Sequence, residues 1–191
     1  MGRVGTAGAV AIGAALVVSV KNASTLEEAI SKTNNVFKAS GVVVQNWSKG
    51  LAKDFGLSRQ EALASVSQFG DMYLQMGLGA DKAVEMSQAM VELTADMGSF
   101  HDLESAEVQT KIASAMRGEY EAIRSIVPAL SGKRVAEEAM IATGKKSVTQ
   151  LTAQDKAMAT YQILMKDTAS AQGDFARTSD GMANSTKTMK A

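Results

Sequence analysis

The chain of 191 residues has no cysteine, one proline and one histidine, and only 5% of its residues are aromatic. The absence of cysteine excludes disulfides and thiolate metal sites. One histidine, His101, cannot provide the histidine set of a usual zinc site. With so little proline and few alternating β-branched stretches, the composition favours helix over strand. We therefore expect an all-α protein with no metal centre and no cofactor.

The chain also lacks a net charge, because 20 basic residues balance 20 acidic ones. A balanced chain has no broad electrostatic attraction to nucleic acid or to an acidic membrane surface. We expect no specific nucleic-acid binding. The length suits one sizeable core or one compact domain with an attached arm.

Methionine is the abundant apolar residue, with 12 copies. Methionine is unbranched and polarisable, so a core rich in it can repack against a partner. The spacing of apolar residues at three and four predicts a compact bundle of helical hairpins. The expected core comprises Leu63, Val66, Phe69, Met72, Met86, Met90, Leu93, Ile112, Met116, Ile123, Tyr161 and Leu164.

Capping signals and glycines divide the bundle into helices. Ser24 with Glu27, Ser58 with Glu61, and Thr152 with Asp155 have the spacing of helix N-terminal caps. We expect Gly41 to break the first helix, and a second helix, 42–54, to bury Val43, Val44, Trp47 and Leu51. The helices beginning near Ser58 and near residue 80 are expected to form an antiparallel hairpin. Further helices are expected over 104–116, up to Pro128, over 132–144 and from 152 onward.

Residues 112–127 indicate two helices that meet at Gly118. Ile112 and Met116 lie one turn apart, and Gly118 can adopt the positive φ that ends a helix. Ile123, Ile126 and Val127 then restart the apolar stripe. We expect a hinge at Arg117–Glu119 between two packed helices.

The segment Val4–Val20 is uncharged and almost wholly small or apolar, which sets it apart from the rest of the chain. It is short for a bilayer span, and its glycines dilute its hydrophobicity. Three interpretations stay open: a helix packed in the protein or against a partner, a membrane-active segment, or a signal peptide without a clear cleavage site. We expect an apolar helix over 1–22, a helical domain over 23–172, and over 173–191 a polar tail that is held less firmly than the rest of the chain.

Three segments carry a resemblance to a known family. They are Ala115-Met116-Arg117-Gly118-Glu119-Tyr120-Glu121-Ala122-Ile123-Arg124, then Leu151 to Tyr161, and Ala171 to Asn184. In order and spacing they resemble the conserved domain of tailed-phage tail tape measure proteins, over residues 23–191. The motif residues, for which we expect a structural role, are Arg117, Gly118, Glu119, Tyr120, Gly173, Asp174, Phe175 and Arg177.

The resemblance implies a structural role in phage tail assembly, and possible participation in DNA ejection. Tape measure proteins set tail length through a long helical region inside the tail tube. The implied partners are tail-tube subunits, tail assembly chaperones or other copies of the chain. The alternative function, which follows from the apolar segment and not from the resemblance, is a membrane-active helical protein that inserts through Val4–Val20. The implied locations are the virion tail and, during assembly, the host cytoplasm.

Two features limit what the resemblance implies. As one unbroken helix the whole chain would span only about 290 Å, and its glycines indicate folded hairpins rather than a rod. The chain is thus either a domain of a longer protein or a shortened prophage product. We expect no enzymatic activity, because nucleophile, base and metal ligands do not converge in the pattern, and an aspartate near His101 in sequence is not a catalytic dyad in space.

Overall fold

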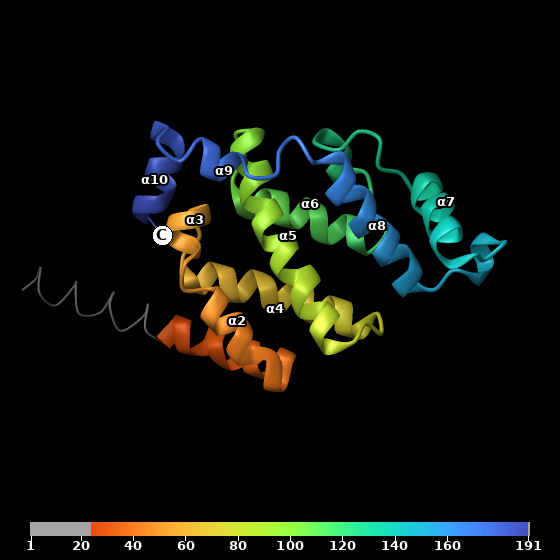
Figure 1. Cartoon of the computed structure of the whole chain (residues 1–191), viewed down its shortest axis with the longest axis horizontal. Coiled ribbons are helices and arrows are strands. Elements are labelled where there is room, and N and C mark those ends of the chain that lie inside the picture. The colour runs from red at the N-terminus through yellow and green to blue at the C-terminus, as the bar shows by residue number, and fades with distance from the viewer. Residues whose placement is uncertain (1–23, 191) are drawn as a thin grey trace, which may run out of the picture.

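The computed structural model describes residues 24–190, apart from the side chains of residues 182 and 183. Within that range the regular elements are all helical, which confirms the predicted all-α class (Figure 1). They are a helix over residues 24–37, then η1 Lys38–Ser40, α2 Gly41–Trp47, α3 Leu51–Phe55, α4 Arg59–Gln75, α5 Ala80–Phe100, α6 Ser105–Met116, η2 Ala122–Ser125, α7 Gly132–Thr143, η3 Val148–Gln150, α8 Ala153–Asp167, α9 Asp174–Arg177 and α10 Met182–Lys190.

The predicted apolar segment Val4–Val20 lies outside the described residues. Among residues 24–190, no helix is long and apolar enough to cross a membrane.

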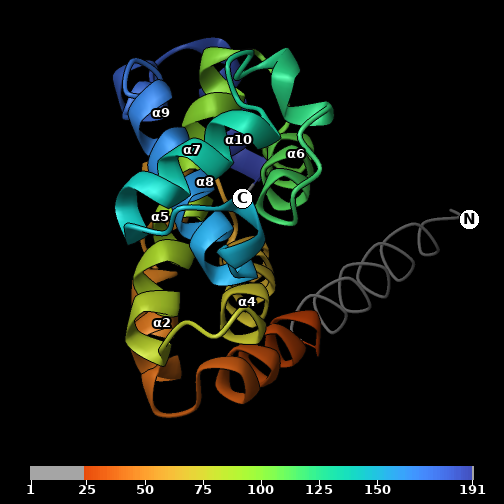
Figure 2. The same ribbon diagram turned by 90° about the vertical axis from the view of Figure 1, so that its right-hand side faces the viewer.

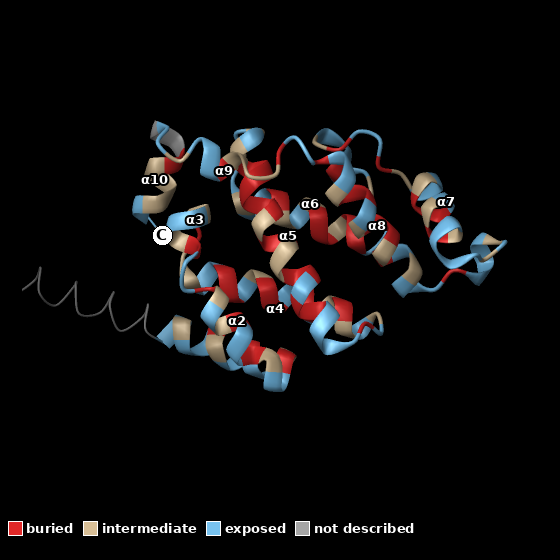
Figure 3. Cartoon of the chain, viewed as in Figure 1, coloured by how far each residue is buried: buried red, intermediate tan, exposed pale blue. Residues whose placement is uncertain are grey.

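Helix α5 is the centre of the bundle. Of its 21 residues, 12 are buried. Helices α4 and α6 pack along it, and the short α9 covers part of it (Figures 1 and 3). Helix α8 in turn packs on α6 and on α7. A helix surrounded in this way needs apolar or small residues on more than one face.

The helix over residues 24–37 runs alongside α4 in the same direction. Thr25 hydrogen-bonds Gln60 at 3.0 Å, and the hydroxyls of Thr33 and Ser67 lie 2.9 Å apart. Residue 24 therefore lies beside the start of α4. Figure 2 shows this helix along the lower edge of the molecule, with α6 in the upper half.

The first two predicted helices are placed differently from the prediction. Ser24 is itself helical, so it is not the cap. The first break falls at Lys38, whose φ is 49°, whereas Gly41 has helical angles and opens α2. Gly41 is needed for close packing, because a Cβ there would lie 2.8 Å from Asn34 Oδ1.

The predicted helix 42–54 is divided into α2 and α3 by a turn over residues 48–50. Its predicted buried face is correct for Val44 and Leu51 and wrong for Val43, which is 57% exposed. Trp47 is partly buried and donates from Nε1 to Glu92 Oε1 at 2.9 Å. Val42, which precedes Val43 in α2, is also exposed, at 62%.

Two of the predicted caps are present in full. Ser58 and Thr152 each accept a backbone N–H from an acid three residues on, and that acid accepts the cap's own N–H. The hairpin of α4 and α5 and the core are confirmed, with two exceptions: Met72 and Tyr161 are only partly buried.

The predicted hinge at Arg117–Glu119 is a turn that closes α6. Gly118 has a φ of 95°, and the amides of Gly118 and Glu119 donate back to Ala115 and Ser114, both at 3.0 Å. These two bonds form the Schellman pattern, in which glycine adopts the left-handed conformation.

The element after this turn is a single 3-10 helix, η2, and not the predicted second α-helix. Pro128 disfavours helical angles at Val127, so too few residues remain for an α-helix. Ile123 and Val127 are buried as predicted, while Ile126 is partly buried.

The close packing of α4 on residues 24–37 leads to a stability prediction. A Cβ at Gly70 would lie 2.1 Å from Phe37 Cζ. We expect Gly70→Ala to lower the free energy of unfolding by about 1–3 kcal/mol, because the ring cannot be accommodated beside it. Phe37→Leu should cost less in the Gly70→Ala background than alone, as a thermal-denaturation double-mutant cycle would show. A Gly70→Ala protein as stable as wild type, as helix propensity alone would favour, would contradict this packing.

Candidate functional site

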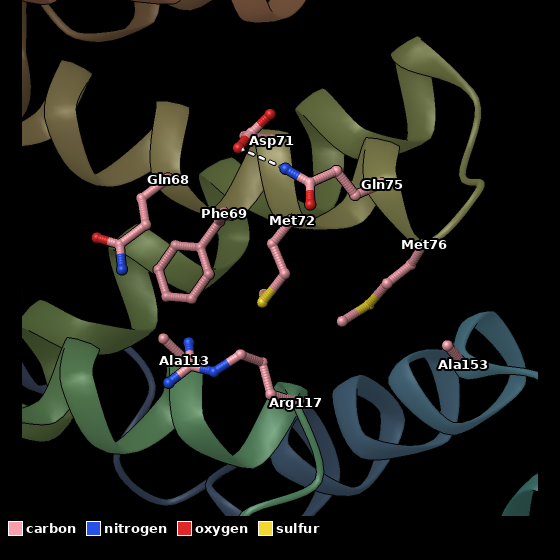
Figure 4. A pocket seen from close by; sticks show the side chains of 9 residues that line it. All are labelled: Gln68, Phe69, Asp71, Met72, Gln75, Met76, Ala113, Arg117 and Ala153. Atoms are coloured by element: carbon pink, nitrogen blue, oxygen red, sulfur yellow. Dashed lines mark hydrogen bonds between the residues drawn. The ribbon is translucent and has the colours of Figure 1, made fainter.

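A groove lies between α4 and α6. Both helices pack on α5, and Gln109 of α6 joins them by hydrogen bonds to Ser65 and Gln68 of α4, at 2.7 and 2.9 Å. The hollow between them has a volume of about 410 Å³ and is shown in Figure 4. We call it the α4/α6 groove; it is lined by Gln68, Phe69, Asp71, Met72, Gln75, Met76, Ala113, Arg117 and Ala153.

The groove has an apolar wall and a polar rim. Met72 and Met76 point from α4 toward α6, and Arg117 extends along α6 toward Phe69 (Figure 4). On the rim, Gln75 donates to Asp71 at 2.8 Å. Flexible thioethers beside one exposed guanidinium are typical of surfaces that bind an amphipathic helix or another apolar protein segment.

The groove continues past the end of α6. A second hollow of about 260 Å³ shares Met76, Arg117 and Ala153 with it and adds Met116, Gly118, Tyr120 and Lys156. The turn after α6 therefore forms one wall, and its conformation depends on Gly118. Glu119 points to solvent, 69% exposed, with its carboxylate 3.9 Å from Arg117. Arg117 also donates to Ser114 Oγ at 3.1 Å.

The first turn of α8 closes one end of the groove, and a charged cluster holds it there. Thr152 N–H donates to the Asp155 carboxylate at 2.7 Å, and Lys145 donates to the same carboxylate. The Lys145 hydrogen bond, followed by that from Thr152, lowers the pKa of Asp155 to about 2. This cluster fixes the first turn of α8, which carries Ala153 and Lys156.

The motif residues fall into two sets, Arg117–Tyr120 and Gly173–Arg177. The second set packs against the C-terminal part of α5. The buried carboxylate of Asp96 accepts the amide of Gly173 at 2.7 Å and that of Phe175 at 3.1 Å. Burial raises the pKa of Asp96, and these two amides oppose the rise. Phe175 is 1% exposed, and a Cβ on Gly56 would lie 2.7 Å from its ring. Residues 173–175 are thus packed on the bundle, although the sequence predicts that the polar tail is held less firmly than the rest of the chain.

Ser99 extends this attachment. It donates to Asp174 at 2.6 Å and accepts from Asn184 at 2.8 Å. Arg177 donates to the carbonyls of Gln172 and Ser170 at 2.7 and 3.1 Å, closing the turn before α9. The structure does not bring the two motif sets together: Arg117–Tyr120 border the α4/α6 groove, whereas Gly173–Arg177 bind α5.

Neither set resembles a catalytic centre. Across the part of the chain that the structure describes, no group of three histidine, cysteine or acidic residues is placed to hold a metal ion. The ring of His101 lies edge-on to Phe100, with 5.1 Å between centroids, and it lines neither of the hollows described above. The two hollows described above offer contact surfaces.

Comparisons with known proteins give no family for the chain. No family model matches it, and comparisons with curated proteins and with solved structures found no significant match.

Arg117, Gly118 and Tyr120 are identified from the sequence, but the groove that they border is not. Met72 and Met76 continue the apolar stripe of α4, so they read as core. Whether two helices on a shared neighbour also contact each other is a tertiary property, and the sequence carries no local signal for it. The one clue is a stripe ending in methionines rather than in branched residues.

The charged cluster at α8 gives a pH prediction. Because the pKa of Asp155 is lower in the folded protein than in the unfolded chain, its carboxylate stabilises the fold above about pH 4, and that contribution is lost as the pH falls through about 2. We expect Asp155→Asn to lower the melting temperature at neutral pH by about 2–4 °C.

That difference from wild type should shrink as the pH falls from about 4 toward 2 and vanish below the folded pKa. A suitable control is Glu137→Gln, since Glu137 makes only an exposed pair with Lys133 at 3.8 Å and should change the melting temperature little. A pH-independent difference between wild type and Asp155→Asn would contradict the assigned role of the carboxylate.

Proposed function

We propose that the chain is a structural domain of a tailed-phage tape measure protein that acts as a scaffold through protein contacts in tail assembly. The observation that supports this most is that the family-like motif lies at the groove. In the motif that resembles this family, Arg117 lines the α4/α6 groove, and Gly118 and Tyr120 line the hollow that continues it. A motif that both ends a helix and borders an apolar groove suits a protein-binding role.

The chemistry of the groove supports the same role. Its apolar contact surface comes from the partly buried Met72 and Met76, since Phe69 is fully buried, and its charge comes from Arg117 with Asp71 on the rim. A helix with an apolar face and polar flanks would bury the methionines and leave the rim charges in water. Methionine side chains adjust to such a partner at small conformational cost.

The proposal also includes the partners, location and non-enzymatic role that the resemblance implies. The partners proposed are tail-tube subunits, tail assembly chaperones or other copies of the chain, in the host cytoplasm and later in the virion tail. The proposed role is structural and not enzymatic. The ruler function belongs to a long helical region, so this chain contributes a scaffold contact and not the length measurement.

Binding to the tail-tube subunit encoded in the same genome tests the proposal. We expect calorimetry to detect association, and Met72→Glu to weaken it at least tenfold, which corresponds to about 1.4 kcal/mol, because the charge would be buried against the partner. The matched control is Met189→Glu, since Met189 is 81% exposed on α10 and lies outside the groove; its affinity should stay within about twofold of wild type. Absence of binding to tube subunits and chaperones at about 100 µM, or equal losses in both variants, would contradict the proposal.

A further inference from the structure

We infer that the α4/α6 groove selects one class of partner, an amphipathic helix with two apolar residues one turn apart and a carboxylate about one turn beyond them. The inference rests on the proposed function, because it uses the same groove, and it adds the charge and the spacing of the segment bound there. The charges around the groove, the spacing of its methionines and the character of its rim each support it.

Two cations lie at the end of the groove beside α8. Arg117 lines both hollows, and Lys156 lines the second one, which has no acidic residue in its lining. Within the described part of the chain Lys156 makes no ion pair, and the only acid paired with Arg117 is Glu119, at 3.9 Å and 69% exposed. An ion pair so long and so exposed contributes little. Both cations can therefore pair with a carboxylate from a partner.

The other acids near this end do not satisfy the two cations. Asp155 precedes Lys156 in sequence, but its carboxylate accepts hydrogen bonds from Lys145 and from the amide of Thr152. Asp71 lies on the opposite wall, in α4, and accepts from Gln75 at 2.8 Å. The wall formed by α6 and α8 is thus the side on which a partner's acid gains most.

The methionines set the spacing. The amide of Met76 donates to the carbonyl of Met72 at 3.1 Å, so the two residues lie one turn, about 6 Å, apart along α4. A helix laid along α4 has the same rise, and apolar residues at i and i+4 would cover both methionines. Met76 also lines the second hollow, with Arg117 and Lys156, so an acid at i+7 would reach the cations. Because cations stabilise the carboxyl-terminal end of a helix, that end should lie beside α8.

The rim favours a protein segment over an acyl chain that carries a carboxylate. Gln68, Asp71 and Gln75 border the methionines on the α4 side (Figure 4). Amide and carboxylate groups in this position can hydrogen-bond the polar flank of an amphipathic helix. An acyl chain has polar atoms only at one end, so it would leave this rim without partners. The helix meets the apolar wall, the polar rim and the two cations at once.

Three synthetic helical peptides of about 18 residues test the inference on the full chain. Each has an alanine-rich sequence with leucine at i and i+4, and they carry glutamate, glutamine or lysine at i+7. Fluorescence anisotropy measures their binding. We expect the glutamate peptide to bind at least fivefold more tightly than the lysine peptide, with the glutamine peptide between them. The difference should shrink as the ionic strength rises from about 0.05 to 0.5 M.

A charge reversal in the protein is the matching test. Lys156→Glu should bring the affinities of the glutamate and lysine peptides to within about twofold of each other, because it removes one of the two cations. The control is Lys166→Glu, since Lys166 is an exposed lysine of the same helix and lines neither hollow. It should keep the wild-type preference. Thermal denaturation checks that both variants fold.

Equal affinities of the three peptides for the wild-type chain would overturn the inference, as would an equal loss of preference in both variants. So would the absence of peptide binding at about 1 mM. Decanoate that binds more tightly than the glutamate peptide would also overturn it, since an acyl chain would then be the occupant. Association with the tail-tube subunit is measured separately by calorimetry, so failure of this inference can be distinguished from failure of the proposed function.

Discussion

The burial of α5 on several faces is the constraint on which the rest of the structure depends. Its methionine and leucine seam packs on one side, and the other faces carry small or polar residues, Ser87, Thr94, Ala95, Asp96 and Gly98. These small side chains let neighbouring backbones approach closely. A Cβ on Gly98 would lie 2.9 Å from the Leu103 carbonyl oxygen. The polar ones must find partners within the protein, because an unpaired buried polar group costs free energy.

Asp96 shows how that requirement shapes the chain far away in sequence. A carboxylate on a buried face of α5 is tolerated because the amides of Gly173 and Phe175 donate to it. The same contact brings Phe175 into the core beside Gly56. One buried acid thus fixes where the chain after α8 runs.

The sequence predicts local features well and tertiary choices less well. Both fully formed caps, the glycine turn at Gly118 and the seam of α5 follow from local patterns of residues and are confirmed. The second buried face of α5 is missed, because serine, threonine and alanine on a helix read as a solvated face. The packed Phe175 is missed for the same reason: one aromatic in a polar stretch gives no periodic signal, and its partner Asp96 lies far away in sequence.

The candidate site divides in the same way. The turn at Gly118 is predictable because glycine readily adopts the left-handed conformation that ends α6. The positions of Arg117 and Tyr120 are predictable because they are close to Gly118 in sequence. The groove is not predictable, since it exists because α4 and α6 share α5 and leave space between themselves. Because α4 and α6 both pack on α5, an apolar groove lies between them.

Native-state hydrogen exchange measures the central claim, which is that α5 is the element on which the other helices depend. We expect the amides of residues 84–98 to be the slowest to exchange, with free energies of opening that equal global unfolding, while α10 and α7 open at lower cost. Amides of α5 that exchange as fast as those of α7, or that open before α4 and α6, would contradict it.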